Sequence, residues 1–207
     1  MRWVMAAAGL TWEQVGLDTQ EQFLHLRDVE KCLLFGQLPV LEIDGLQLVQ
    51  SQAMLRYVAR REGLSPVEPS EAVLCDMVAE SIDDARSLLI GAPFASDKAA
   101  HLTRLPGLFD KYFPRFEGIL AKSTAGTVLP SGKICYADVL LAELVHGYSQ
   151  LSPGCLQKYP GLQNLMDKIL AMPSIKEYLN DPKRRYPYPE GEVAVAYTTN
   201  VNLVLGR

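Results

Sequence analysis

The residues best suited to bind a ligand lie at the ends of one short stretch, FGQLPVLEIDGLQLVQS, residues 35–51. Pro39 opens a strand-like run, a position that tolerates proline because the first residue of a strand need not donate to the ladder. If the Leu38–Pro39 peptide is cis, the chain reverses before the strand, and the backbone N–H and C=O of Leu38 face outward unpaired. An extended peptide could then bind along Leu38 like an added strand. A plain strand start is the alternative for Pro39.

Gln50 and Ser51 end the same stretch, where a strand passes into a helix. The free N–H groups of the first helical turn and the positive end of the helix dipole attract a carboxylate at such a point. The Ser51 hydroxyl and the Gln50 side chain would add donors. The alternative for Ser51 is a simple N-cap. A peptide-binding edge beside a carboxylate site indicates a site for a small acidic peptide.

Other chemistry finds no support in the spacing of reactive residues. His25, His101 and His146 form no H-E-x-x-H motif, and no G-x-S-x-G motif or phosphate-binding glycine loop occurs. The four cysteines lie far apart, with no C-x-x-C pair and no histidine at metal-ligand spacing. This pattern indicates reduced thiols, a cytoplasmic location and no metal or other cofactor.

Composition narrows the class of partner. The chain has 207 residues, 48% of them hydrophobic, so it can bury a sizeable core. Its 20 basic and 24 acidic residues give a net charge of −4, and no basic run exceeds Lys183-Arg184-Arg185, so no nucleic-acid partner is expected. No segment approaches the roughly 20 apolar residues of a membrane span. The opening MRWVMAAAGL could be read as a short signal peptide, but the polar segment TWEQ follows at once.

Several short elements must position the candidate site. Residues 2–8 are expected to end a helix that Gly9 stops, and TWEQVGL, residues 11–17, is expected to form a short strand. Thr19 and Gln22 fit a capping box that opens a helix through about residue 26.

The site stretch itself predicts a hairpin. Asp44-Gly45 is a strong two-residue turn signal between two apolar runs, residues 40–43 and 46–49, which we predict as strands. A helix from about Ser51 to residue 62, closed by Gly63, is expected to follow.

A change of pattern divides the chain in two. The segment LSPVEP holds two prolines in six residues and is the best linker candidate. We therefore predict a small α/β domain over residues 1–63, a linker over 64–69 and an all-helical domain over 70–207. The predicted helices of the second part are one long helix over about 73–89, a stretch over 97–122 that Pro106 and Pro114 must break or kink, and helices over 136–149 and 162–171.

QLPVLEIDGLQLVQS, with the earlier RWVMAAAGL, closely resembles the glutathione-binding half of the cytosolic glutathione S-transferases. KYFPRFEGIL at residues 111–120 is similar to an alpha-class segment, and the order of elements matches over nearly the whole chain. The resemblance implies an α/β thioredoxin-like N-terminal domain (incomplete) plus an all-α helical C-terminal domain. It also implies a homodimeric detoxification enzyme that conjugates the thiol of glutathione, its co-substrate, to hydrophobic electrophiles.

The resemblance assigns roles to the residues singled out above. Leu38, next to Pro39, would pair its backbone with the cysteinyl part of glutathione, while Gln50 and Ser51 would hold the γ-glutamyl end. Arg27 corresponds to a basic residue near the glycine carboxylate, although the local alignment needs a one-residue insertion and leaves Lys31 as a competing candidate.

Further roles fall on the partner subunit and the second substrate. The resemblance implies that Asp84 reaches the glutathione of the partner subunit and that Phe35 inserts into that subunit. Lys111 replaces a usual arginine, which keeps the charge but loses the bidentate fork. Asp84 could otherwise be a solvated surface residue and Phe35 a core residue. The apolar pocket for the electrophile would draw on Ile90, Gly91, Phe94 and the C-terminal segment around Tyr197.

Two positions depart from the family pattern. In alpha-class relatives a tyrosine on the first strand donates to the glutathione sulfur, and an arginine a few residues later supports it. Met1 aligns just ahead of the first helix, so the first strand and both residues are expected to be absent, and no catalytic residue is assigned. The alternative is that the protein is a noncatalytic relative, which either binds glutathione or hydrophobic ligands or has a structural role. Cys135 stands where the family has a Ser or Thr cap, and a thiol caps more weakly, by about 1 kcal/mol.

Overall fold

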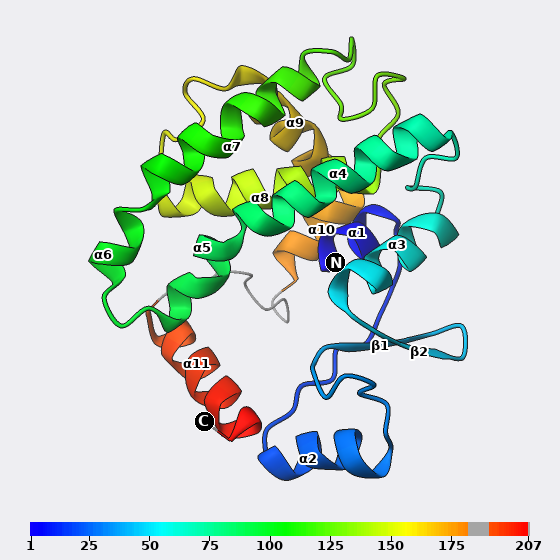
Figure 1. Ribbon diagram of the computed structural model, residues 1–207, viewed down its shortest axis with the longest axis vertical. Helices are drawn as coiled ribbons and strands as arrows, with labels where there is room; N and C mark the ends of the chain where they lie inside the picture. The colour runs from blue at the N-terminus through cyan, green and yellow to red at the C-terminus, as the bar shows by residue number, and fades with distance from the viewer. Residues whose placement is uncertain (182–190, 207) are drawn as a thin grey trace.

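The hairpin predicted around Asp44-Gly45 forms in the computed structural model, which describes residues 1–181 and 191–206 (Figure 1). Strands β1 (Val40–Ile43) and β2 (Leu46–Val49) pair antiparallel, with Val40 opposite Val49. Asp44 and Gly45 both have positive φ angles, 53° and 75°, which the tight turn requires. Within the described residues this is the whole of the sheet.

Three helices and one π-helical turn accompany the hairpin: α1 (Arg2–Ala7), α2 (Gln20–Leu24), η1 (His25–Val29) and α3 (Ser51–Arg61). The capping box at α2 is confirmed, because the Gln22 backbone N–H donates to Thr19 Oγ1 at 3.3 Å and the Thr19 N–H donates to Gln22 Oε1 at 3.1 Å. α3 holds the tip of the hairpin, since the Tyr57 hydroxyl and the Arg61 guanidinium both contact Asp44 Oδ2 at 2.8 Å.

The strand predicted over residues 11–17 is wrong. These residues have no regular structure, and the hairpin strands pair with each other rather than with this segment. A strand needs a ladder partner, and its alternating side chains alone do not provide one. The segment is held from the helical half instead: the rings of Trp12 and Tyr178 lie 5.6 Å apart, and the Asn200 side chain donates to the Leu17 carbonyl at 3.0 Å.

The second part of the chain is helical, as predicted, although several boundaries differ. The long helix ends at Ala85 and a short one begins at Ser87, while Pro106 lies in the first turn of a helix and Pro114 lies inside it. Two helices near the C-terminus were not predicted. The elements are α4 (Pro69–Ala85), α5 (Ser87–Gly91), the 3₁₀ turn η2 (Ala92–Phe94), α6 (Lys98–Leu102), α7 (Leu105–Leu120), α8 (Tyr136–Leu151), α9 (Pro160–Leu170), α10 (Pro173–Asn180) and α11 (Gly191–Leu205).

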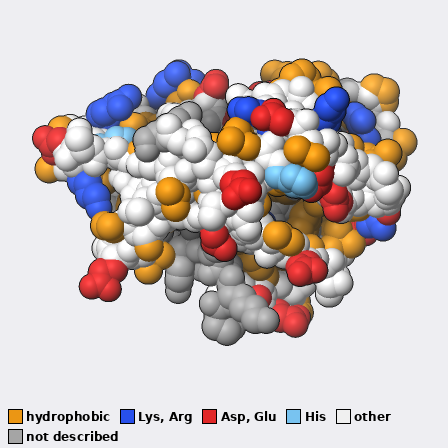
Figure 2. All heavy atoms as spheres, turned by 90° about the horizontal axis from the view of Figure 1, so that it is seen from below, with side chains coloured by type: hydrophobic (Ala, Val, Ile, Leu, Met, Phe, Trp, Pro, Cys, Tyr) orange, Lys and Arg blue, Asp and Glu red, His pale blue; other side chains and the backbone are white. Residues whose placement is uncertain are grey.

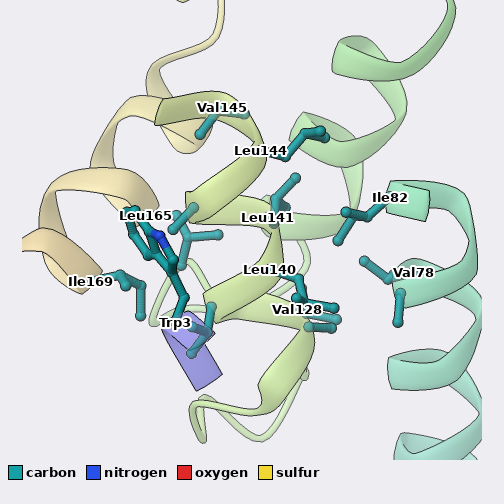
Figure 3. Packing of buried hydrophobic residues seen from close by; sticks show 14 of the residues in the cluster. Trp3, Val78, Ile82, Val128, Leu140, Leu141, Leu144, Val145, Leu165 and Ile169 are labelled. Atoms are coloured by element: carbon teal, nitrogen blue, oxygen red, sulfur yellow. The ribbon is translucent and has the colours of Figure 1, made fainter. Parts of the chain in front are cut away.

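Helix α8 forms the centre of the core, with α4 on one side and α1 and α9 on the other (Figures 1 and 3). Leu140, Leu141 and Leu144 of α8 are each 1% exposed and pack in one cluster with Ile82 of α4 and Trp3 of α1. Because α1 shares this cluster, the N-terminal half is joined to the helical half by apolar packing.

The start of α8 is fixed by a buried carboxylate. Asp138 accepts hydrogen bonds from the backbone N–H groups of Cys135, at 2.8 Å, and Val128, at 2.7 Å. Cys135 is the N-cap residue, at the place the sequence pattern indicated. Burial raises the pKa of Asp138, and the two backbone hydrogen bonds oppose that shift.

Helix α11 packs outside the main core. Its Val204 joins a small second cluster with Phe23, Cys32 and Leu33, which lie in or just after α2 and η1. α11 therefore spans from α5 and η2 to α2 (Figure 1). Among the described helices, none has both the length and the apolar character required to cross a bilayer. The run Lys183-Arg184-Arg185 lies outside the described residues.

Candidate functional site

The hairpin register brings together the two halves of the predicted peptide site. Val40 pairs with Val49, so Leu38–Pro39, just before β1, and Gln50–Ser51, just after β2, lie at the same open end of the hairpin. The Leu38–Pro39 peptide is cis, which is the condition set for the peptide-binding interpretation. Leu38, Pro39, Gln50 and Ser51 are all solvent-exposed, which leaves this end accessible to a ligand.

The start of α3 offers unpaired donors. Gln50 occupies the N-cap position and Ser51 is the first helical residue, so Ser51 is not the N-cap. No side chain caps this 11-residue helix, and the N–H groups of its first turn are therefore available to an anion. Gln50 has a φ of 69° and a ψ of 112°, a conformation that non-glycine residues rarely adopt and that recurs at binding sites. Sequence reasoning did not detect this strain.

The two basic candidates for the second carboxylate differ in their surroundings. The Arg27 guanidinium holds the Asp28 carboxylate through two contacts of 2.7 Å, and this hydrogen bonding lowers the pKa of Asp28. Lys31, two residues after the end of η1, is exposed and forms no ion pair with the described residues. Lys31 is therefore the more available cation.

The remaining predicted glutathione contacts lie in the helical half. Asp84 is exposed on α4, in a stripe with Val73, Met77 and Glu80 at helical spacing. Lys111 is exposed on α7, where its ammonium lies 4.7 Å from the centre of the Tyr112 ring. Within the described chain, no hydrogen bond or ion pair joins Asp84 or Lys111 to the open end of the hairpin.

The structure brings together two of the residues predicted for an apolar pocket. The rings of Phe94, in η2, and Tyr197, in α11, meet edge to face with centroids 5.8 Å apart. Phe94 is 46% exposed and Tyr197 40% exposed, so both rings keep free faces. Ile90 and Gly91 lie in α5, just before η2. The helical form of the C-terminal segment, which the sequence did not reveal, places Tyr197 there.

Seen from below, over α2 and α11, the described residues show no single charged patch. Figure 2 shows acidic side chains spread among hydrophobic ones on this face, with Lys and Arg mostly toward the edges. Among the described residues no cluster of His, Cys, Asp and Glu is suited to hold a metal ion. A surface hollow of about 350 Å³ lies between the end of α7, the segment 121–126 and helix α9, bordered by Glu117 and Lys168, and none of the predicted site residues lines it.

The fold thus has two parts, a hairpin whose open end meets the uncapped start of α3 and a bundle of helices. The pattern of the glutathione S-transferase N-terminal domain matches residues 1–60, and that of the C-terminal domain matches residues 87–182. The chain belongs to the glutathione S-transferase family. The predicted fold class, a thioredoxin-like half followed by a helical half, is thereby confirmed.

Named relatives extend over most of the chain. Rat glutathione S-transferase alpha-4 is 36% identical over 92% of this chain and 86% of its own length. Human glutathione S-transferase A4 is 33% identical over 97% of this chain and 90% of its own length. Among solved structures, the Ascaris lumbricoides glutathione S-transferase has a TM-score of 0.76 at 27% identity and covers 90% of this chain and 92% of that one. A monomeric glutathione S-transferase from the hookworm Necator americanus has a TM-score of 0.77 at 26% identity, with 89% and 92% covered.

Proposed function

We propose that this member of the family conjugates the thiol of glutathione to hydrophobic electrophiles and binds glutathione along the open end of the hairpin. The observation that carries the proposal is the hairpin register, which sets the exposed Leu38 beside Gln50 and Ser51 at the uncapped start of α3. An extended peptide with a carboxylate fits such an arrangement, because backbone pairing and helix-terminal N–H groups recognise different parts of it.

Each part of glutathione has a proposed partner. The cysteinyl backbone pairs with Leu38, and the γ-glutamyl carboxylate meets Gln50, Ser51 and the first N–H groups of α3. For the glycine carboxylate we favour Lys31 over Arg27, because Arg27 is already bound to Asp28. No residue of this chain is assigned to activating the thiol, and no cofactor beyond the co-substrate is proposed.

The electrophile is proposed to bind against Phe94, Tyr197, Ile90 and Gly91. Phe94 and Tyr197 offer free aromatic faces, and Ile90 is 55% exposed just before them in the chain. Such surfaces bind apolar compounds because burying them releases water, at about 25 cal/mol per Å² of apolar area.

A homodimer is proposed from the exposed apolar side chains. Phe35 is 61% exposed, and Val73 and Met77 on the outer stripe of α4 are 56% and 61% exposed. Asp84, on the same stripe, and Lys111 are then the residues proposed to act on glutathione at or across the subunit interface. The monomeric hookworm relative shows that this fold does not require a partner, so the oligomeric state needs its own test.

Variants at the hairpin end test glutathione binding. We expect Gln50→Ala and Ser51→Ala each to raise the KM for glutathione by about tenfold, because a hydrogen bond to a charged group contributes about 1.5 kcal/mol or more. Gln47→Ala is the matched control, since Gln47 is an exposed residue of β2 whose side chain bonds only Glu42 among the described residues. Its KM should stay unchanged.

The measurement combines retention on immobilised glutathione with conjugation of a chlorinated aromatic electrophile. Wild-type retention together with measurable conjugation supports the proposal. Retention without conjugation would replace it with a noncatalytic glutathione-binding function. If the chain is neither retained nor active in conjugation, the proposed site is refuted. Cytoplasmic location is proposed from the four free cysteines and is tested by fractionating cells that express the protein.

A further inference from the structure

Two cysteines that are distant in the sequence meet inside the main core. Cys75 lies on α4 and Cys135 is the N-cap residue of α8, and their sulfur atoms are 3.2 Å apart. Both side chains are buried, with exposures of 0% and 1%. The other two cysteines have no thiol neighbour: the Cys32 thiol donates to the Leu26 carbonyl at 3.4 Å, and Cys155 is half-buried elsewhere.

The backbones on both sides of this pair are held in place. The residues that follow the two cysteines also contact each other, because the Tyr136 hydroxyl of α8 donates a hydrogen bond to Asp76 of α4. Asp138 fixes the Cys135 N–H at 2.8 Å, and the Tyr136 N–H donates to the Leu64 carbonyl at 2.9 Å. A disulfide has an S–S distance of about 2.05 Å, so the sulfurs need to approach by only about 1.2 Å.

We propose that Cys75 and Cys135 are a redox pair that hydrogen peroxide converts into an intrachain disulfide between α4 and the start of α8. This modification is independent of glutathione transfer, because neither cysteine belongs to the site described above.

The chemistry divides between the two sulfurs. The Cys135 thiol beside it lowers the pKa of Cys75, while the hydrogen bond with Cys75, together with burial, raises the pKa of Cys135. We therefore assign the first attack to Cys75 and the second to Cys135.

In the first step the Cys75 sulfur attacks one peroxide oxygen, the O–O bond breaks, and the released hydroxide takes the proton that Cys75 loses to give water. Cys75 is then a sulfenic acid. In the second step the Cys135 sulfur attacks Cys75, the S–O bond breaks, and the leaving hydroxide takes the Cys135 proton as a second water. Two thiols and one peroxide thus give one disulfide and two waters.

Peroxide would reach the buried pair through local opening of the segment before Cys135. The segment before Cys135 contains the exposed residues Ser131 and Lys133, and local opening of such a segment requires less free energy than global unfolding. Hydrogen peroxide is close to water in size, so a small opening is sufficient.

The disulfide would link α4 covalently to the start of α8 and so stabilise the folded protein. It would close a loop between residues 75 and 135 that contains α5, α6 and α7. It would also fix α4 to α8 directly beside Asp76, which binds Arg56 of α3 at 3.1 Å. Because cross-linking a loop of this length restricts the unfolded chain, the thermal midpoint of the oxidised protein should rise by about 5 to 10 °C.

The test treats the full chain with hydrogen peroxide and measures intact mass, free thiols after denaturation, and the thermal midpoint. We expect the loss of two hydrogen atoms, a Cys75–Cys135 cross-linked peptide, a higher midpoint, and full reversal by a dithiol reductant. Cys135→Ser supplies a hydroxyl cap in place of the thiol, and Cys75→Ala keeps an apolar core residue, so both should fold and lack the cross-link. Cys155→Ser is the matched control and should retain it.

Three results would overturn the proposal. One is oxygen addition at Cys75 with no cross-link in the folded wild type. Another is a cross-link that involves Cys32, Cys155 or a second molecule, and the third is a bridge that leaves the thermal midpoint unchanged.

Discussion

At the scale of single residues, Asp76 connects three elements. It accepts a hydrogen bond from the Tyr136 hydroxyl of α8 and pairs with Arg56 Nε of α3 at 3.1 Å. Arg56 also contacts Glu80, one turn further along α4. Partial burial opposes ionisation of Asp76, but the hydrogen bonds from Tyr136 and Arg56 outweigh it and lower the pKa of Asp76 below 3.8. The carboxylate form therefore stabilises the contact between the two halves.

Acid should weaken this contact in a predictable direction. Because the pKa of Asp76 is lower in the folded state than in the unfolded state, its contribution to the free energy of unfolding is complete above about pH 4 and is lost as the pH falls through the folded-state pKa. We expect Asp76→Asn to be less stable than wild type at pH 6, and the difference to shrink toward pH 3. Urea unfolding at several pH values measures this.

Tyr136→Phe serves as the companion variant for that experiment. It removes one of the three groups that lower the pKa of Asp76, so it should show a smaller pH-dependent loss of stability than wild type. A difference between wild type and Asp76→Asn that is constant from pH 6 to pH 3 would contradict the role given to the ionised carboxylate.

At the scale of elements, α11 is the least firmly packed of the long helices. Only Ala194 and Val204 of this helix are buried among its described residues, and Val204 contacts the small cluster that includes Phe23 and Leu33. The helix nevertheless carries Tyr197 to Phe94 and contacts α2. Its position thus depends on a few apolar contacts.

Val204→Asp is expected to release α11 without unfolding the protein, because a buried unpaired carboxylate is costly while the main core does not include Val204. Hydrogen exchange over residues 191–205 should become at least tenfold faster, and the global unfolding midpoint should change little. Val195→Asp, at a position 63% exposed, is the control and should leave exchange unchanged. Equal effects of the two variants would argue against docking through Val204.

Short sequence motifs correctly predicted the turn and the helix start that depend only on neighbouring residues. Asp44-Gly45 and the capping box at Thr19 specify their turn and helix start through nearby backbone angles and hydrogen bonds, and both predictions were confirmed. The hairpin register then brought Leu38 to Gln50. The predicted strand over residues 11–17 failed because pairing depends on a distant partner. The contact between Cys75 and Cys135 likewise joins positions that no local pattern relates.

The C-terminal helix was missed for a different reason. α11 is apolar on most of its surface, so its sequence lacks the alternation of polar and apolar faces by which a helix is recognised. The predicted division at residues 64–69 stays a prediction, although α4 begins at Pro69. The roles given to Arg27, Lys31, Asp84 and Lys111 also stay predictions, because they depend on a bound ligand or a second subunit.

At the scale of the whole molecule, the proposed dimer is based on exposed apolar side chains. Phe35, Val73 and Met77 are all more than half exposed, and apolar side chains that together form one exposed patch mark an interaction surface. Leu34, next to Phe35, is 75% exposed and Val67 is 97% exposed.

We expect the wild-type chain to be a dimer at micromolar concentration and Phe35→Ser to weaken the dimer by at least tenfold, as loss of a buried aromatic anchor does. Light scattering after size-exclusion chromatography measures the mass of each. Val15→Ser, at another exposed position of the same half, should leave the dimer intact. A wild-type chain that stays monomeric would place this protein with the hookworm relative in that respect.

Trp3 has one more consequence. Its ring is 1% exposed and packs among side chains of the helical half, although it comes from the segment of the chain that leads to the peptide site. Exchanging the first 60 residues with those of a relative would therefore not be a simple swap of a recognition surface. The transplanted segment would have to fill the same volume beside α8 as the Trp3 indole does. Only relatives with a side chain of similar shape at this position could exchange the segment without disturbing the core.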